Sequence, residues 1–229
     1  MKKLMLSAAL FVLCAASAAR ADTLTFTPSP ADLNDLDHHM VYTWKISNVD
    51  LKGQQISGAK LTFKNIRNWN SSSNRLYVHL LDNARFAGVA GFVDDPNPNN
   101  TNVEMKDDFV DPRFHNQSNW LVAPNTADTH LHTYVNIPDT AQTLVYTFSE
   151  SEWNDLFNYI TRGTSPGSFA LGFDPDCHFF NDGIKLEIYT KPPASVPEPA
   201  TLALLGTGLA GLYARRRRQQ QQLREGREA

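Results

Sequence analysis

Apolar and polar residues alternate with a period of two along most of the chain, which is the pattern of strands that bury one face. The alternation is clearest in residues 59–66 and 184–189, where aliphatic or aromatic side chains occupy every second position. Residues 40–46 and 144–148 repeat it with larger aromatic side chains. Further strand candidates are residues 24–27, 76–81, 131–137 and 168–173.

About eight such segments predict an all-β fold, an antiparallel β-sandwich of jelly-roll-like character. Parallel α/β architecture is not expected, because helical segments do not alternate with the strands. One helical pattern occupies residues 149–163: Ser149 and Glu152 stand at capping-box spacing, apolar residues follow at helical spacing, and Gly163 ends the pattern. We expect this short helix to cover one end of the sandwich, with its aromatic side chains in the core.

The alternation fades in residues 87–125. A loop of this length is unusual inside a compact domain and is typical of binding loops, metal-held loops or disordered segments. Asp107, Asp108 and Asp111 are candidate cation ligands within it. A solvated charged loop is the favoured interpretation of the same residues.

The densest group of candidate ligands follows a predicted strand. Asp174, Asp176, Asn181 and Asp182 place four side-chain oxygens within nine residues, just before a glycine. Hard oxygen ligands suit Ca²⁺, and a glycine permits a sharp turn, so these residues predict a calcium site. The spacing is not that of an EF-hand loop. A hairpin loop stabilised by Asx turns explains the same composition, and both interpretations stay open.

Two tryptophans lie in polar surroundings, Trp69 between asparagines and Trp120 after Asn119. Exposed tryptophan rings can stack on the apolar faces of sugar rings, so both residues are candidate ligands for a polysaccharide. Their exposure decides between this role and core packing, and the sequence does not determine exposure.

Neither the spacing of the histidines nor any known catalytic motif indicates a metal site or an active site. His130 and His132 share one strand face, and His38 and His39 are adjacent, but no third ligand stands at a suggestive spacing. We therefore expect surface histidines. The sequence lacks a G-x-S-x-G elbow, an H-E-x-x-H motif, a P-loop and a dinucleotide fingerprint. No catalytic residue is predicted, and a non-enzymatic protein is favoured.

The N-terminal residues have the three parts of a secretory signal peptide. Lys2 and Lys3 precede an apolar run that leads to Ala19-Arg20-Ala21, an A-x-A cleavage site. Residues 16–18 offer a second site, so the mature chain starts at residue 22 or 19. One of the two cysteines lies in this leader, so Cys177 has no partner for an intramolecular disulfide. Two phenylalanines beside Cys177 favour a buried thiol.

The charge between the chain's two ends is strongly acidic. Residues 22–196 hold 12 Lys and Arg against 21 Asp and Glu, so the net charge of this part is 12 − 21 = −9. Nucleic-acid binding needs a basic face and is not expected. Divalent cations and neutral or basic polymers remain suitable partners, and acidity alone also favours solubility.

The C-terminal residues form a second tripartite signal. Pro197, Glu198 and Pro199 precede a mostly apolar run over residues 200–214. The prolines favour an extended, accessible segment, and the apolar run predicts a single transmembrane helix. Four arginines follow and are expected to keep the tail in the cytoplasm. They are Arg215, Arg216, Arg217 and Arg218.

In this order and position, the three parts resemble the PEP-CTERM sorting signal of exported proteins in Gram-negative bacteria. The resemblance implies recognition by a membrane-embedded exosortase, processing near the Pro-Glu-Pro, and a single-pass inner-membrane precursor that ends at the cell surface or in the extracellular matrix. The expected organisation is a signal peptide (1–21), an exported β-sandwich domain (22–192), a linker (193–199), a transmembrane helix (200–214) and a cytoplasmic tail (215–229).

The preferred function is that of a non-enzymatic surface or matrix protein, polysaccharide-binding and calcium-stabilised. A polysaccharide-processing hydrolase or lyase is the first alternative, and it requires a cleft lined by close carboxylates. A self-associating structural surface protein is the second alternative.

Overall fold

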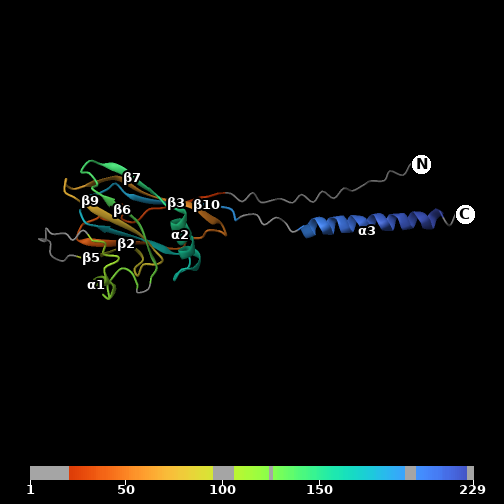
Figure 1. Ribbon diagram of the computed structural model, residues 1–229, viewed down its shortest axis with the longest axis horizontal. Coiled ribbons are helices and arrows are strands. Elements are labelled where there is room, and N and C mark those ends of the chain that lie inside the picture. Colours follow the sequence, from red (N-terminus) through yellow and green to blue (C-terminus); the bar gives the residue numbers. More distant parts are fainter. Residues whose placement is uncertain (1–20, 95–105, 124–125, 194–199, 226–229) are drawn as a thin grey trace. The chain divides into compact units, whose positions relative to one another are not determined.

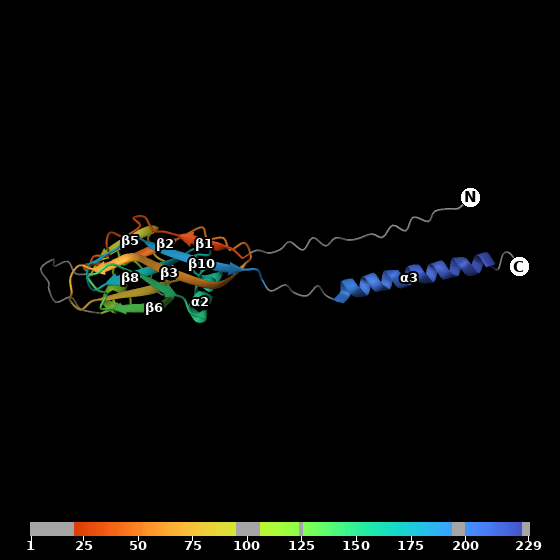
Figure 2. The same cartoon turned by 90° about the horizontal axis from the view of Figure 1, so that it is seen from above.

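Two antiparallel sheets form where the sequence alternates apolar and polar residues (Figures 1 and 2). The computed structural model describes residues 21–94, 106–123, 126–193 and 200–225. The chain divides into two compact units, residues 1–192 and residues 193–229. Most of the predicted signal peptide, including Ala19, and the Pro-Glu-Pro segment lie outside the described residues.

The first sheet holds the chain's first and last strands side by side. Strand β1 (Thr23–Phe26) pairs with β10 (Ile184–Lys191). The remaining members are β3 (Gln55–Asn68), β7 (Gln142–Thr147) and the short β9 (Phe179–Phe180), which pairs with the end of β3.

The second sheet carries the candidate functional site. Its central strand is β8 (Phe169–Pro175), and all seven of its residues are buried. The order across the sheet is β5 (Gly88–Val93), β2 (Met40–Ile46), β8, β4 (Arg75–Leu81) and β6 (Asp128–Val135).

The strand order agrees with the expected jelly-roll character. When β5 and β9 are set aside, the other eight strands can be numbered in chain order. The first sheet then has the order 1-8-3-6 and the second the order 2-7-4-5, which is the order found in jelly rolls. The β-sandwich prediction is therefore confirmed at the level of two antiparallel sheets.

Alternation in the sequence places the main core between the sheets. In β10, Ile184, Leu186 and Ile188 are at most 1% exposed, whereas Lys185 between them is exposed. From the second sheet, Phe169, Leu171 and Phe173 of β8 and neighbouring side chains of β4 join the same cluster.

Helix α2 (Glu150–Arg162) lies where the sequence predicts it. Ser149 and Glu152 form the capping box, and Gly163 is the C-cap. Leu156 and Ile160 are buried in the main core. The helix packs mainly against β3, which confirms that it covers part of the sandwich.

The prediction of one irregular segment over residues 87–125 is wrong in part. Residues 88–93 form the edge strand β5, and Pro112–His115 form the short helix α1, capped by Asp111. Strand β5 escapes the periodicity test because Gly88, Ala90 and Gly91 carry little or no side chain, and only Phe92 of the strand is buried.

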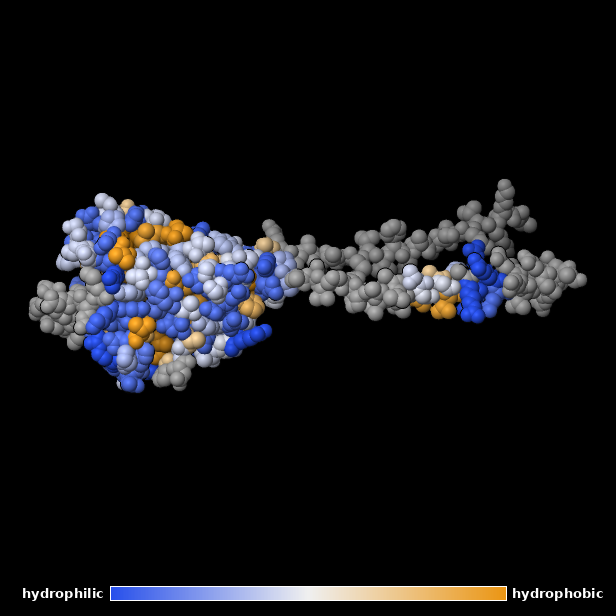
Figure 3. Space-filling view, viewed as in Figure 1, coloured by the Kyte–Doolittle hydropathy of each residue, from blue (hydrophilic) through white to orange (hydrophobic). Residues whose placement is uncertain are grey.

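The second unit contains helix α3 (Ala200–Glu225). It continues eleven residues past the expected end at residue 214, so the four arginines lie inside the helix and are exposed. Along α3, apolar surface gives way to hydrophilic surface (Figure 3). Within the described residues, no helix combines the length and the apolar character needed to span a membrane, and the predicted transmembrane helix is not confirmed.

Candidate cation site beneath residues 106–123

The outer face of the second sheet is covered by residues 106–123, which include α1 (Figure 1). Alternation along β8 points Ala170, Gly172 and Asp174 outward, because their neighbours point into the main core. A second apolar cluster fills the space between sheet and cover. Its members are Val41, Leu81, Ala84, Phe92, Phe109, Phe114, Trp120, Leu121 and Ala170.

Gly172 lets this cover approach the sheet closely. A Cβ atom built on Gly172 would lie 2.5 Å from Cζ of Phe109, far inside van der Waals contact. The ring of Phe109 therefore needs a glycine beneath it. This contact brings Asp107 and Asp108, the residues just before Phe109, down to the sheet.

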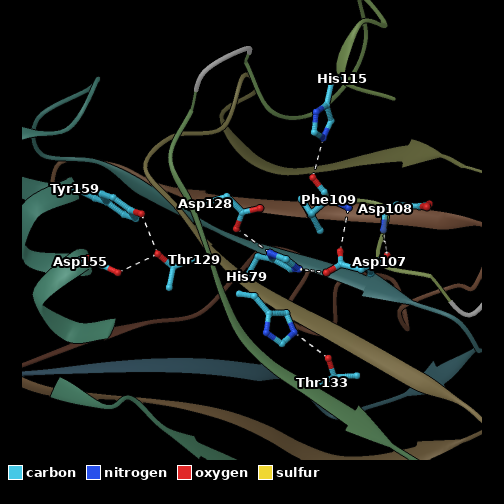
Figure 4. A network of polar contacts seen from close by, with 12 residues as sticks. His79, Asp107, Asp108, Phe109, His115, Asp128, Thr129, Thr133, Asp155 and Tyr159 are labelled. Atoms are coloured by element: carbon cyan, nitrogen blue, oxygen red, sulfur yellow. Dashed lines mark hydrogen bonds and ion pairs between the residues drawn. The ribbon is translucent and has the colours of Figure 1, made fainter. Parts of the chain in front are cut away.

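His79 lies on the same outer face between two carboxylates (Figure 4). It pairs with Gly172 across β4 and β8, and its side chain is 0% exposed. His79 Nδ1 lies 2.8 Å from Asp128 Oδ1, and His79 Nε2 lies 3.0 Å from Asp107 Oδ2. The rings of His79 and Phe109 are 4.7 Å apart, so the imidazole is closed off on one side by the cover.

Both carboxylates hold His79 in its charged form. Burial lowers the pKa of His79, but the hydrogen bonds to Asp107 and Asp128 outweigh it and raise the pKa to about 9. A protonated imidazole donates from both nitrogens and has no lone pair for a metal. His79 is therefore a buried cation on β4. Its two hydrogen bonds link Asp107 and Asp128, the first residue of β6, to this strand. Burial, followed by repulsion from His79, lowers the pKa of the neighbouring His130.

Next to His79, three carboxylates from three segments converge. One oxygen from each of Asp94, Asp108 and Asp174 lies within 4.8 Å of the other two. Asp174 is 1% exposed and Asp108 is 8% exposed. The backbone N–H of Asp108 donates to Asp174 Oδ2 at 2.7 Å, which fixes the loop against the end of β8.

The electrostatics of this cluster disfavour three bare negative charges. Burial, then repulsion from Asp94, raises the pKa of Asp108 to about 8. Burial, then repulsion from Asp108, raises the pKa of Asp174 well above its ordinary value and that of Asp176 to about 8. Asp176 is 6% exposed, and its Oδ2 has no hydrogen-bond partner among the described residues. A divalent cation among the three converging carboxylates would relieve their mutual repulsion.

A cavity of about 320 Å³ opens beside this network. Phe109, His115, Trp120 and Asp128 are among its lining residues, and His115 Nε2 lies 2.8 Å from the carbonyl oxygen of Phe109. Asp128 thus borders the cavity while it also holds His79.

The four predicted calcium ligands divide into two pairs. Asp174 belongs to the carboxylate cluster and Asp176 is buried near it, whereas Asn181 and Asp182 have partners elsewhere. Asn181 Nδ2 donates to the carbonyl of Asp32 at 2.8 Å, and Asn181 Oδ1 accepts from the N–H of Gly183 at 2.9 Å, which is the Asx turn of the alternative interpretation. Asp182 Oδ2 accepts from Asn65 Nδ2 at 2.6 Å.

The charged loop that contains residues 107–111 supplies a ligand to the carboxylate cluster, whereas Asn181 and Asp182 do not. Asp108 enters the cluster, Asp107 binds His79, and Asp111 caps α1 and pairs with Arg113. The sequence marks these three aspartates and Asp174 as candidate ligands in two separate groups. No periodic pattern indicates that the loop and the end of β8 lie close together. Asp94 was missed, because it follows the unrecognised strand β5.

The two tryptophans have opposite environments. Trp120 is 1% exposed and packs against Phe92 and Phe114, so its ring has no free face for a sugar. Trp69 is 57% exposed and stays a candidate platform. The buried state expected for Cys177 is confirmed at 8% exposure, and His130 and His132 are exposed as expected.

Comparison with known families identifies the C-terminal signal. Residues 195–218 match the model of the PEP-CTERM protein-sorting motif. The predicted sorting signal is confirmed, and the motif implies a chain that is exported, recognised by an exosortase and processed at the membrane. No curated protein matches the chain.

Proposed function

We propose that residues 22–192 form a non-enzymatic, calcium-stabilised module that the sorting signal delivers to the cell surface or extracellular matrix. The observation that supports it is the carboxylate cluster of Asp94, Asp108 and Asp174, with the buried Asp176 beside it. Oxygen-only ligands from segments far apart in the chain suit Ca²⁺, and its binding would cross-link the cover to the second sheet. The calcium prediction is thereby moved from Asn181 and Asp182 to Asp94 and Asp108.

Calcium is expected to stabilise the domain and to displace protons. At pH 7, carboxyls with pKa values of about 8 are mostly protonated, so each Ca²⁺ should release roughly one to two protons. Ca²⁺ at a hundredfold excess over its Kd should raise the Tm by about 5–10 °C. Without metal, stability should fall as pH rises from about 4 towards 8, because the folded carboxyls hold their protons longer than the unfolded ones.

Scanning calorimetry with EDTA or Ca²⁺, and titration calorimetry in buffers of different ionisation enthalpy, measure both effects. Asp174→Asn should abolish the Ca²⁺ response while leaving the metal-free Tm equal or higher, because the amide keeps an oxygen that can accept the N–H of Asp108 and cannot ionise. Asp139→Asn, at an exposed position between β6 and β7, is the matched control. An unchanged Tm with Ca²⁺ in the wild type contradicts the proposal.

The proposed ligand of the module is an extracellular polysaccharide, and its support is the exposed ring of Trp69. Loss of one stacking platform should weaken glycan binding at least tenfold in Trp69→Ala. Binding to the cell's own exopolysaccharide and to a glycan array measures this, with Phe86→Ala as a control at another exposed aromatic residue. Equal binding by both variants and the wild type would remove Trp69 from the site.

The same preparations separate the two alternative functions. Depolymerisation of exopolysaccharide by the purified protein would indicate a hydrolase or lyase. Neither turnover nor glycan binding, together with concentration-dependent self-association in sedimentation, would favour a structural surface protein.

A further inference from the structure

A second group of candidate ligands lies on another part of the domain, where residues 36–38 meet residues 177–180. One ligand atom from each of Asp37, His38 and His178 lies within 4.8 Å of the other two. His38 Nδ1 and Asp37 Oδ1 are 3.4 Å apart. Ligands of a tetrahedral zinc site with bonds of about 2.0–2.1 Å stand about 3.3 Å apart. Two of the three groups are therefore already at the spacing that such an ion requires.

Backbone contacts hold these segments together without any ion. The N–H of Phe179 donates to the carbonyl of Leu36 at 3.2 Å, and the N–H of Trp69 donates to the carbonyl of His178 at 3.0 Å. Leu36 and Phe179 are both 0% exposed, so the two ligand-bearing segments are anchored in the core. A site whose ligands are fixed in advance loses little entropy when it binds.

The surroundings also orient the individual ligands. Asp37 Oδ1 accepts the backbone N–H of His39 at 3.2 Å, and the backbone N–H of Asp37 donates to Tyr42 Oη at 3.0 Å. The ring of Trp69 stacks parallel to that of His38, with centroids 6.4 Å apart and planes 14° apart. Such outer contacts are what hold metal ligands in position.

One nitrogen in the group lacks the partner that its burial demands. His178 Nε2 is buried and has no hydrogen-bond partner within the described parts of the chain. Leaving a buried polar atom unsatisfied is unfavourable, and a neutral imidazole nitrogen is a good ligand for a transition metal.

We propose that Asp37, His38 and His178 bind a first-row transition-metal ion, Zn²⁺ in the first instance, with a fourth position open to water. Two imidazoles and one carboxylate are borderline ligands that select Zn²⁺ over Ca²⁺, whereas the cluster of Asp94, Asp108 and Asp174 offers oxygen alone. The third ligand, His178, was beyond reach of the sequence, because it stands 140 residues after His38.

Titration of the full chain, purified without a polyhistidine tag and kept in excess Ca²⁺, tests the site. We expect one equivalent of Zn²⁺ by calorimetry, and one equivalent of Co²⁺ with the intense visible absorption of tetrahedral coordination. His178→Ala and His38→Ala should each weaken Zn²⁺ binding at least tenfold and remove the Co²⁺ band. Asp37→Asn, which keeps the shape of the side chain, should also weaken binding.

His130→Ala and Asp139→Asn are the matched controls, because His130 belongs to another group of candidate ligands and Asp139 is an exposed aspartate that belongs to none of the three. Both should bind Zn²⁺ and Co²⁺ as the wild type does. Circular dichroism and the Tm of each variant show that its fold is kept. Wild-type binding no tighter than that of His178→Ala and Asp37→Asn, or an equal loss in His130→Ala, would overturn the proposal.

Discussion

Replacing Pro197, Glu198 and Pro199 together by alanine should stop processing of the chain, so that the full-length precursor accumulates. Proline fixes φ and disfavours helical conformation at the residue before it, so the sequence predicts an extended segment that a processing enzyme can reach. With three alanines, the helix would extend through the segment and bury the same backbone groups in its own hydrogen bonds. Immunoblots of cell fractions and mass spectrometry of the released protein measure the outcome.

Pro192 and Pro193 provide the control for this experiment, because they lie just upstream of the matched motif. Their replacement by alanine should leave processing intact. If the triple variant were processed and released like the wild type, the Pro-Glu-Pro would have no role in recognition.

His79→Ala should destabilise the domain by about 3–5 kcal/mol at pH 6, the range for removing one partner of a buried ion pair. Asp107 and Asp128 would then face each other's charge across an empty space. In the wild type, the pKa of His79 is about 9 when folded and 6.5 when unfolded. The folded state therefore holds the proton more tightly, which contributes about 3 kcal/mol below pH 6.5. That contribution is lost as pH rises from 6.5 through 9.

Urea unfolding at several pH values measures this effect, and the difference in unfolding free energy between wild type and His79→Ala should narrow as pH rises from 6.5 to 9. His130→Ala is the control, because its ring is exposed and its main polar contact is with Thr133 at 2.8 Å. It should cost well under 1 kcal/mol. A constant gap between pH 6 and pH 10 would mean that His79 acts through packing and not through charge.

The sandwich could be predicted from the sequence because most strands bury one face and expose the other to solvent. In β10, Leu186 and Ile188 alternate with residues that reach solvent. The alternation of buried and exposed positions therefore appears in the sequence as an alternation of apolar and polar residues. Strand β8 was recognisable for a different reason: residues 169–173 are all apolar, since the strand is covered on both sides. The capping box of α2 was equally local, because Ser149 and Glu152 are three residues apart.

The candidate site was only half predictable. Its ligands come from β8, from the residue that follows β5 and from a loop that folds back over the sheet. Asp108 and Asp174 are 66 residues apart in the sequence. The close contact of the Phe109 ring with Gly172 brings them together. This contact depends on the shapes of two distant residues, so it produces no periodic pattern in the sequence. His79 did leave a trace: it is the one basic residue in the otherwise apolar or aromatic run of residues 76–81, and a histidine in such a run must find buried partners.

The pairing of β1 with β10 imposes an order of events on export. Asp22 and Thr190, 168 residues apart, exchange hydrogen bonds at the ends of these two strands. Because β10 also lies between β1 and β3, the first sheet cannot be completed until the chain is available as far as Lys191. Along the sequence, only residues 192–199 lie between β10 and α3. The last strand of the first sheet and the sorting signal thus follow each other closely along the chain. A chain that stalls before β10 therefore lacks both a complete first sheet and the sorting signal.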